Sequence, residues 1–395
     1  MQKATILLFG LLLIFSGCGD SPSNYTDPRG ADYAGSESCI QCHKDISHSY
    51  TQTAHYKATA SATPENVLGD FTTGRNEFLY EDHTKLVMER RNDSLYQVHY
   101  KNGKEVKAYR FDIVFGSENA QTAVYWNNNN TFEMPISYYK AVHNWATSPG
   151  FSTAKPYFER QAIKDCFACH SSNVSNKAYD KSSDASHFMA MEVEDVMNKS
   201  TIIYGIDCER CHGPAKKHVD FHLKFPEIKA ANEIVSFNKL TNQQKLDACS
   251  ICHSGVAGLK IKSRFQFKPG DNLSDYYRTP QDSDGDVHGN QAGLLSQSKC
   301  FIKSQTMNCL TCHNPHENAA KNVAAYSKMC MSCHEKPKHI PKTIQSIAVS
   351  GMPNNCIDCH MPNQSSKAIT FKMSNNPKQF DYNLRTHKIG VYPLK

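Results

Sequence analysis

The sequence predicts a mainly α-helical chain with much irregular structure and one small antiparallel β module near the N-terminal end. Three observations support this fold class. Only 39% of the 395 residues are hydrophobic, which is low for a chain that must fill an ordinary apolar core. From about residue 160 onward, short helical patterns alternate with irregular connections. Residues 75–140 hold the only β-rich stretch, so we expect the β module there.

A short motif is repeated seven times along the chain. Fourteen of the sixteen cysteines fall in copies of Cys-x-x-Cys-His. Two thiols three residues apart on one helical turn reach the two vinyl groups of one haem, and the next residue can give its imidazole to the iron. The sequence therefore predicts seven covalently attached haems c. The motif residues are Cys39, Cys42 and His43; Cys166, Cys169 and His170; Cys208, Cys211 and His212; Cys249, Cys252 and His253; Cys309, Cys312 and His313; Cys330, Cys333 and His334; and Cys356, Cys359 and His360.

Three alternatives account for these cysteines less well. Zinc sites use Cys-x-x-Cys pairs, but they do not need a histidine after every pair. Redox dithiols of the thioredoxin type sit in βαβ units, which the pattern does not predict here. Disulfides would rarely take so uniform a spacing. The motifs thus favour haem c, and the irregular helical structure is expected to wrap around macrocycles that supply the missing apolar core.

Residues 1–17 have the pattern of a bacterial lipoprotein signal peptide. A positive charge precedes an apolar run over residues 6–15 that is too short to span a bilayer, and small residues lead into Cys18. Cleavage would leave Cys18 as a lipidated N-terminus; an ordinary signal peptide is the alternative. Residues 18–35 are predicted to form a flexible tether. We therefore expect a lipid-anchored protein on the periplasmic side or at the cell surface, with the outer membrane favoured.

The motifs also predict how the rest of the chain is organised. We expect a first haem segment over residues 36–74, the β-rich insertion over residues 75–140, and a six-haem helical domain over residues 141–395. Asn102-Gly103 is a type I′ hairpin signal between two strand patterns. Thr241 is a predicted N-cap of the helix that runs into the fourth motif.

The second axial ligand of each iron decides whether a haem only transfers electrons or also binds a substrate. Nineteen histidines, seven of them in the motifs, leave twelve candidates. His316 follows His313 by one helical turn, so the two cannot bind opposite faces of one iron. We expect His316 to bind a neighbouring haem, and the same reasoning applies to His218 after His212. The predicted distal ligands are His55, His187, His218, His288, His316, His339 and His387.

Some residues near these ligands have weaker assignments. For the seventh distal position, His187 is favoured over His143 and His222. Three further histidines are not expected to be ligands: His48, His83 and His99. Cys300 lies outside every motif and is predicted to be a small buried residue, with a haem contact or a redox role as the alternative.

Four segments resemble a known group of proteins. They run from Gly35 through Cys39 to His55, over residues 205–218, over residues 309–316 and over residues 356–362. They are similar to multihaem cytochromes c related to hydroxylamine oxidoreductase and its tetrahaem cytochrome c electron acceptor. The resemblance covers residues 35–60 and 140–390, and it implies either an electron carrier or an enzyme acting on a small nitrogen or sulfur compound. The Cys-x-x-Cys-Lys motif common in ammonia-forming nitrite reductases is absent from the sequence, which argues against that activity.

Two functions therefore remain open. One is electron transfer through a chain of mostly bis-histidine haems, in exchange with redox proteins that are themselves membrane-associated. The other is an oxidoreductase with one open, high-spin haem at the motif of Cys166 or of Cys249. The number of histidines favours the first. The formal charge of +6 predicts no nucleic-acid partner, because each oxidised haem c adds roughly −1 and its propionates can pair with the excess lysines.

Overall fold

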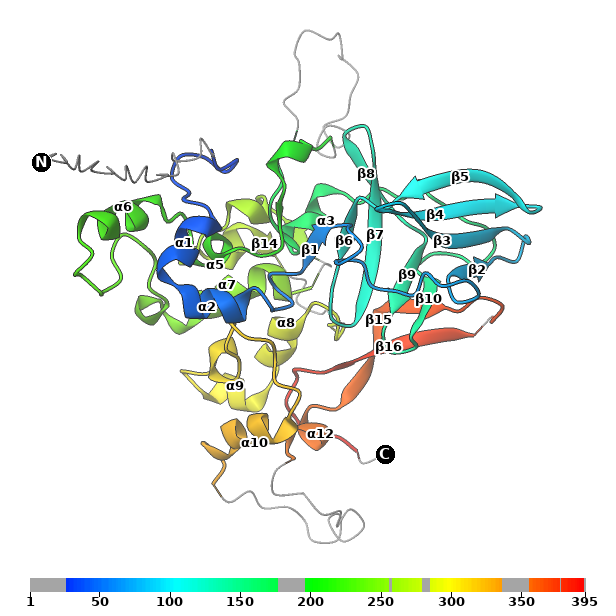
Figure 1. Ribbon diagram of the computed structural model, residues 1–395. Helices are drawn as coiled ribbons and strands as arrows, with labels where there is room; N and C mark the ends of the chain where they lie inside the picture. The colour runs from blue at the N-terminus through cyan, green and yellow to red at the C-terminus, as the bar shows by residue number, and fades with distance from the viewer. Residues whose placement is uncertain are drawn as a thin grey trace, which may run out of the picture.

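The computed structural model describes residues 26–176, 196–255, 258–278, 285–335, 355–376 and 378–393. Cys18, His187 and His339 lie outside these residues. Figure 1 shows the strands gathered on one side of the molecule and short helices on the other. Within the described ranges, no helix is both long and apolar enough to cross a membrane.

A four-stranded antiparallel sheet contains the predicted hairpin. Its strands follow one another in the order β2-β3-β4-β5. Asn102 and Gly103 join β4 to β5 with φ angles of 52° and 72°. Two successive positive φ angles are what a type I′ turn requires, so the hairpin prediction is confirmed. The strands are β2 (Glu77–Leu79), β3 (Lys85–Arg91), β4 (Ser94–Lys101) and β5 (Lys104–Arg110).

A six-stranded sheet packs against the first and encloses the main side-chain core. Its order is β1-β6-β7-β9-β10, and β8 pairs with β7. The shared core includes Phe78, Leu86, Met134 and Trp145, all of which are buried. The strands are β1 (Thr59–Ser61), β6 (Ile113–Phe115), β7 (Ala120–Asn127), β8 (Asn130–Glu133), β9 (Ile136–Tyr139) and β10 (Asn144–Thr147).

A C-terminal hairpin, β15 (Asn363–Lys372) and β16 (Gln379–Arg385), extends this β half. Figure 1 shows it below β10. The backbone N–H of Lys372 donates to Oγ1 of Thr147 at 3.0 Å, and the ring of Phe371 stacks on Tyr139 with centroids 4.2 Å apart. The hairpin lies within the segment that the sequence assigned to a helical domain.

The prediction of a mainly α fold is therefore wrong, since helix and strand content are similar. Two kinds of strand were not predicted from the sequence. β1 and β10, outside residues 75–140, are three and four residues long, too short to show an alternation of apolar and polar residues. β15 is long, but its sequence is rich in Ser, Asn, Gln and Lys and lacks the apolar alternation of a half-buried strand.

The helical half consists of short helices joined by turns. The longest helix of the described ranges is α7, which begins after Thr241 with a capping box to Gln244, so the predicted N-cap is confirmed. The helices are α1 (Ser36–Cys42), α2 (Lys44–Tyr50), α3 (Lys164–Ala168), α5 (Cys208–His212), α6 (Lys216–Lys224), α7 (Asn242–His253), α8 (Gln291–Ser296), α9 (Lys299–Lys303), α10 (Val323–Met331) and α12 (Ile357–His360). The 3-10 turns are η1 (Lys199–Thr201), η2 (Phe237–Lys239), η3 (Arg264–Gln266), η4 (Leu273–Asp275) and η5 (Cys309–Thr311). Short strand pairs complete it: β11 (Ser171–Asn173) with β12 (Ile203–Tyr204), and β13 (Leu259–Lys260) with β14 (Tyr277–Arg278).

Candidate haem-binding site

A cavity of about 2790 Å³ occupies the helical half of the molecule. Cysteines or histidines from all seven motifs line its walls, together with His55, His218, His316 and His387. Most of its other lining residues are apolar or belong to the short helices. The cavity takes the place that a side-chain core would occupy, and a group bound in it would supply the packing that side chains do not.

The motifs form single helical turns, as haem attachment requires. In the first motif the backbone N–H of His43 donates to the carbonyl oxygen of Cys39 at 2.9 Å. The same bond links His313 to Cys309 at 3.0 Å and His360 to Cys356 at 3.0 Å. This turn puts the two cysteines, three residues apart, on the same side of the helix. The local geometry of the polypeptide therefore suits two thioether bonds to one macrocycle.

Two motif histidines face a second histidine with nearly parallel rings. His43 lies opposite His218 with ring centroids 6.4 Å apart and planes at 15°. His212 lies opposite His316 with centroids 6.0 Å apart and planes at 4°. A metal bound between two imidazole nitrogens, each about 2.0–2.1 Å away, holds the ring centroids about 6 Å apart. Two imidazoles that held one iron between them would have this spacing.

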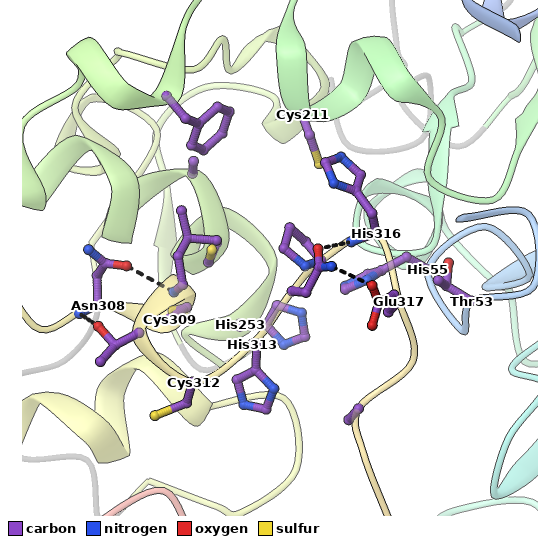
Figure 2. A pocket seen from close by; sticks show the side chains of 18 of the residues that line it. Thr53, His55, Cys211, His253, Asn308, Cys309, Cys312, His313, His316 and Glu317 are labelled. Atoms are coloured by element: carbon purple, nitrogen blue, oxygen red, sulfur yellow. Dashed lines mark hydrogen bonds between the residues drawn. The ribbon is translucent and has the colours of Figure 1, made fainter. Parts of the chain in front are cut away.

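Two further pairs have the same spacing with other ring angles. His55 faces His253 with centroids 5.9 Å apart and planes at 87°. His313 faces His387 at 6.2 Å and 32°. Figure 2 shows His55, His253, His313 and His316 around the cavity. In each of the four pairs, a motif histidine meets a histidine from a different segment of the chain.

The arrangement bears on the expectation that His316 and His218 serve neighbouring motifs. His316 faces His212, the histidine of the third motif, and not His313. His218 faces His43 and not His212. Residues 313–316 are not helical, so the argument from a shared helix face does not hold, although the spatial arrangement is the expected one.

The other predicted distal ligands are placed less closely. His288 lies near enough to His170 for the two to interact electrostatically. His222, the weaker alternative, lines the cavity 4.5 Å from the ring of His218, and its Nε2 is buried with no hydrogen-bond partner within the described structure.

Hydrogen bonds orient several of these imidazoles. Nδ1 of His218 lies 2.7 Å from the carbonyl oxygen of Asn232, and Nδ1 of His360 lies 2.7 Å from that of Gly390. A carbonyl oxygen can only accept, so each Nδ1 carries the proton and each Nε2 keeps its lone pair for a metal. Nδ1 of His253 has a similar contact with Oε1 of Gln291 at 3.1 Å. Desolvation lowers the pKa of His387 to about 4, which keeps that imidazole neutral at neutral pH.

The cysteines of different motifs meet in pairs. Cys39 contacts Cys208, and Cys169 contacts Cys252. The first motif therefore adjoins the third, and the second adjoins the fourth. Cys300 is only partly buried and lines the same cavity, so it is less buried than predicted.

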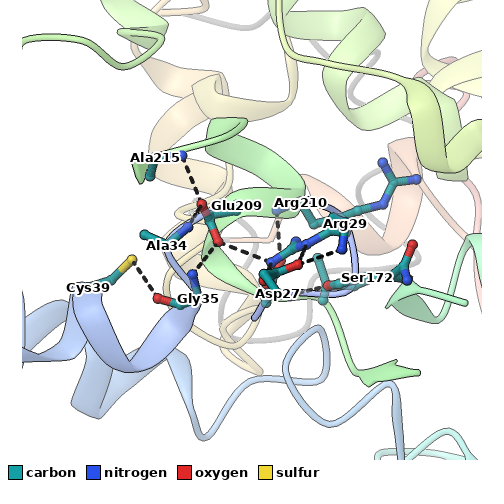
Figure 3. A network of polar contacts seen from close by, with 12 residues as sticks. Asp27, Arg29, Ala34, Gly35, Cys39, Ser172, Glu209, Arg210 and Ala215 are labelled. Carbon is teal, nitrogen blue, oxygen red and sulfur yellow. Dashed lines mark hydrogen bonds and ion pairs between the residues drawn. The ribbon is translucent and has the colours of Figure 1, made fainter. Parts of the chain in front are cut away.

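A buried ion-pair network surrounds the junction of the first and third motifs (Figure 3). Arg29 contacts Asp27 at 2.9 Å, Asp207 at 2.7 Å and Glu209 at 3.1 Å. Glu209 also accepts from the backbone N–H groups of Ala34 and Gly35. Residues 26–35, expected to be part of a flexible tether, are thus held against the body by buried charges that composition alone could not reveal.

Sequence reasoning also missed two buried arginines beside the second and fourth motifs. Nη1 of Arg264 lies 3.3 Å from Sγ of Cys169. Nη2 of Arg210 donates to the carbonyl oxygen of Ala168 at 3.3 Å, and the same oxygen accepts from Sγ of Cys252 at 3.8 Å. Arg210 lies inside the third motif, and the Cys-x-x-Cys-His pattern says nothing of the residues between the cysteines.

Covalently bound haem fits these residues. Each motif turn contributes at least one cysteine to one cavity, pairs of imidazoles face one another across it, and buried polar atoms such as Nδ1 of His387 have no hydrogen-bond partner in the described chain. The motifs and the cavity together define a multihaem c-type cytochrome.

Comparisons with known proteins agree with this class. Residues 316–389 match the family model described as the NapC/NirT cytochrome c family, N-terminal region. The chain is 25% identical over 262 residues to the dissimilatory sulfite reductase MccA of Wolinella succinogenes, an alignment that covers 58% of this chain and 32% of MccA. The chain thus spans about a third of the length of that relative. Its fold is similar to that of the outer cell wall cytochrome OcwA, with a TM-score of 0.53 and 14% identity over 91% of this chain and 80% of OcwA.

Proposed function

We propose that the chain carries seven covalent haems and transfers electrons through mostly bis-histidine irons. The observation that carries the proposal is the set of four histidine pairs, whose ring centroids lie 5.9–6.4 Å apart. Each haem iron supplies a one-electron couple between its ferric and ferrous forms. The motif cysteines hold the macrocycles, and the paired imidazoles fill both axial positions.

The remaining ligands belong to the same proposal. His170 would pair with His288, which interacts with it electrostatically. His187 and His339, which lie outside the described residues, would serve two of the other irons. With both axial positions filled by imidazole, no exogenous ligand has a vacant site, and the absence of a thioether ligand predicts low reduction potentials.

A pyridine haemochrome assay and electron paramagnetic resonance test the proposal together. We expect seven haems per chain, resistant to acid-acetone extraction, low-spin ferric signals only, and a reduced Soret band that carbon monoxide barely moves. A smaller haem count would refute the stoichiometry, and a high-spin signal equal to about one haem would refute the fully bis-histidine arrangement.

The second candidate function is an oxidoreductase with one open haem that acts on a small sulfur or nitrogen compound. The similarity to a sulfite reductase over 262 residues favours sulfite as the first compound to test. Such an enzyme would show one high-spin haem. Once the protein has been reduced with dithionite and the excess removed, sulfite would reoxidise it at a catalytic rate. A reduced spectrum unchanged by sulfite favours the electron carrier.

We propose further that the chain is a lipoprotein held at the membrane or cell surface through Cys18, where it exchanges electrons with membrane-associated redox proteins. The expected signal peptide supports an extracytoplasmic location, and OcwA is by its name an outer cell wall protein. We also propose that the chain is related to hydroxylamine oxidoreductase, as the resemblance over residues 35–60 and 140–390 implies.

A further inference from the structure

At two of the places where cysteines of different motifs meet, the nearby buried side chains have opposite charges. The Cys39–Cys208 junction lies beside carboxylates, and the Cys169–Cys252 junction lies beside guanidinium groups. Each junction is the place where two haems would be attached side by side.

The acidic junction has an excess of negative charge. Three carboxylates, those of Asp27, Asp207 and Glu209, share the single guanidinium of Arg29. The side chains are between 1% and 7% exposed, so solvent screens them little. Glu209 accepts three backbone N–H groups, from Ala34, Gly35 and Ala215.

The basic junction has two guanidinium groups with no carboxylate partner within the described residues. Arg210 and Arg264 are 9% and 7% exposed, and both donate mainly to backbone carbonyl oxygens. Nε of Arg210 has no hydrogen-bond partner in the described structure. A buried cation without a counter-ion is costly, and it acts strongly on any nearby group whose charge can change.

Other charges around the basic junction offset only part of this effect. Asp247 precedes Cys252 by five residues, about 140° around α7, and it binds Gln243 and the N–H of Leu273. Asp286 accepts from the N–H of Ala368, Oγ of Ser366 and the N–H of His288. Asp165 pairs with Lys260. The acidic junction therefore has two more carboxylates than guanidinium groups, whereas the basic junction has two guanidinium groups that pair with no carboxylate in the described residues.

We propose that this buried charge difference sets two redox levels, with low-potential haems at the first and third motifs and a higher-potential haem at the fourth. The inference rests on the proposed function, because it assumes haems at these motifs. A ferric haem carries one more positive charge than a ferrous one, so nearby carboxylates stabilise the ferric form and nearby guanidinium groups stabilise the ferrous form. One electron would then pass from a ferrous haem at the first or third motif to a ferric haem at the fourth. The donor is oxidised, the acceptor is reduced, and no bond or proton changes place.

The histidine pairs supply spectroscopic markers for these haems. Near-parallel imidazole planes give rhombic low-spin signals, and near-perpendicular planes give a signal with a large maximal g value. The planes lie at 15° and 4° at the first and third motifs and at 87° at the fourth. A redox titration of the full-length protein, followed by electron paramagnetic resonance, therefore distinguishes the two groups. On reduction, we expect the large-g signal to disappear at a higher potential than the rhombic signals of the haems whose imidazole planes are most nearly parallel.

Two charge variants test the cause. Arg264→Gln should lower the potential of the large-g signal by at least about 59 mV, which corresponds to a tenfold change in a one-electron equilibrium constant. Glu209→Gln should raise the potential of the rhombic signals by a similar amount and leave the large-g signal in place. Arg264→Lys keeps the charge and should shift the potential of the large-g signal less than Arg264→Gln does. Arg75→Gln, on the exposed surface of the β half, should shift the potential of neither the large-g nor the rhombic signals.

The haem count separates the failure of this inference from that of the proposed function. If all variants keep seven haems and the large-g signal titrates with or below the rhombic ones, the two redox levels do not exist. If Arg264→Gln leaves the potential unchanged, the guanidinium groups do not set it. The absence of any large-g signal from a seven-haem protein would overturn the His55–His253 pairing, and this inference with it.

Discussion

His316 follows His313 by three residues, yet its ring lies opposite His212, with centroids 6.0 Å apart and planes at 4°. The segment after the fifth motif therefore reaches the third motif. His55, which follows the first motif, reaches His253 of the fourth in the same way. Side chains from one motif segment thus complete the site of another, which couples the folding of the segments to the filling of the cavity.

Removal of His316 should open one iron. In His316→Ala we expect one of the seven haems to become high-spin and to bind carbon monoxide, because His212 loses the imidazole opposite it. All seven haems should remain attached, since attachment uses the motif cysteines. Absorption and electron paramagnetic resonance spectra measure both. The control is His48→Ala, an exposed histidine outside the cavity lining, which should give the wild-type spectrum. A wild-type spectrum for His316→Ala would show that His316 is not a ligand.

The perpendicular pair should have a signal of its own. His55→Ala should abolish the large-g low-spin signal and replace it with a high-spin signal of one haem, because the 87° pair loses one ring. His316→Ala should leave the large-g signal at full intensity. If both variants changed the same signal, the pairing of His55 with His253 would be wrong.

The charge network at Arg29 should contribute to stability. Arg29→Met leaves three carboxylates without their buried counter-ion, and breaking such a pair costs about 3–5 kcal/mol. Urea unfolding followed by circular dichroism measures this loss. Arg75→Met removes an ion pair whose arginine side chain is 71% exposed, and it should cost about 0–1 kcal/mol. Equal losses in the two variants would contradict a stabilising role for the buried network.

The β half has a core that is separate from the cavity. Phe78→Ala deletes a fully buried ring that does not line the cavity, and we expect a loss of about 3–5 kcal/mol in the free energy of unfolding. The haem count and the Soret spectrum should not change. Val106→Ala, on the exposed side of β5, should alter stability by only about 0.5 kcal/mol. Haem loss in folded Phe78→Ala would show that the β core supports the cavity after all.

The anchor can be tested without reference to the fold. Cys18→Ala should release the protein from washed membranes into the soluble periplasmic fraction, because lipidation needs the Cys18 thiol and no other membrane contact is predicted. Fractionation with an antibody to the chain measures the distribution. Retention of the variant on membranes after a high-salt wash would contradict the lipoprotein assignment.

The sequence by itself was sufficient wherever a few neighbouring residues decide the structure. The seven Cys-x-x-Cys-His motifs are five-residue turns, and the class of cofactor follows from them. Asn102-Gly103 determines a turn because both residues accept positive φ angles. Thr241 begins α7 because its side chain and that of Gln244 satisfy the first free backbone groups. Each of these depends on contacts within three or four residues of chain.

Tertiary structure decided whatever depends on segments far apart in the chain. The local sequence around a histidine outside the motifs does not say which motif histidine it meets, and only the folding of the chain brings His253 opposite His55 or His387 opposite His313. The hairpin β15–β16 forms part of the β half because it packs against β10, and its own sequence carries little strand signal. The energetic effects of the charges of Arg29, Arg210 and Arg264 depend on the tertiary structure in the same way. A charge in the sequence has no defined partner or solvent exposure until the fold buries it, and both decide its energy.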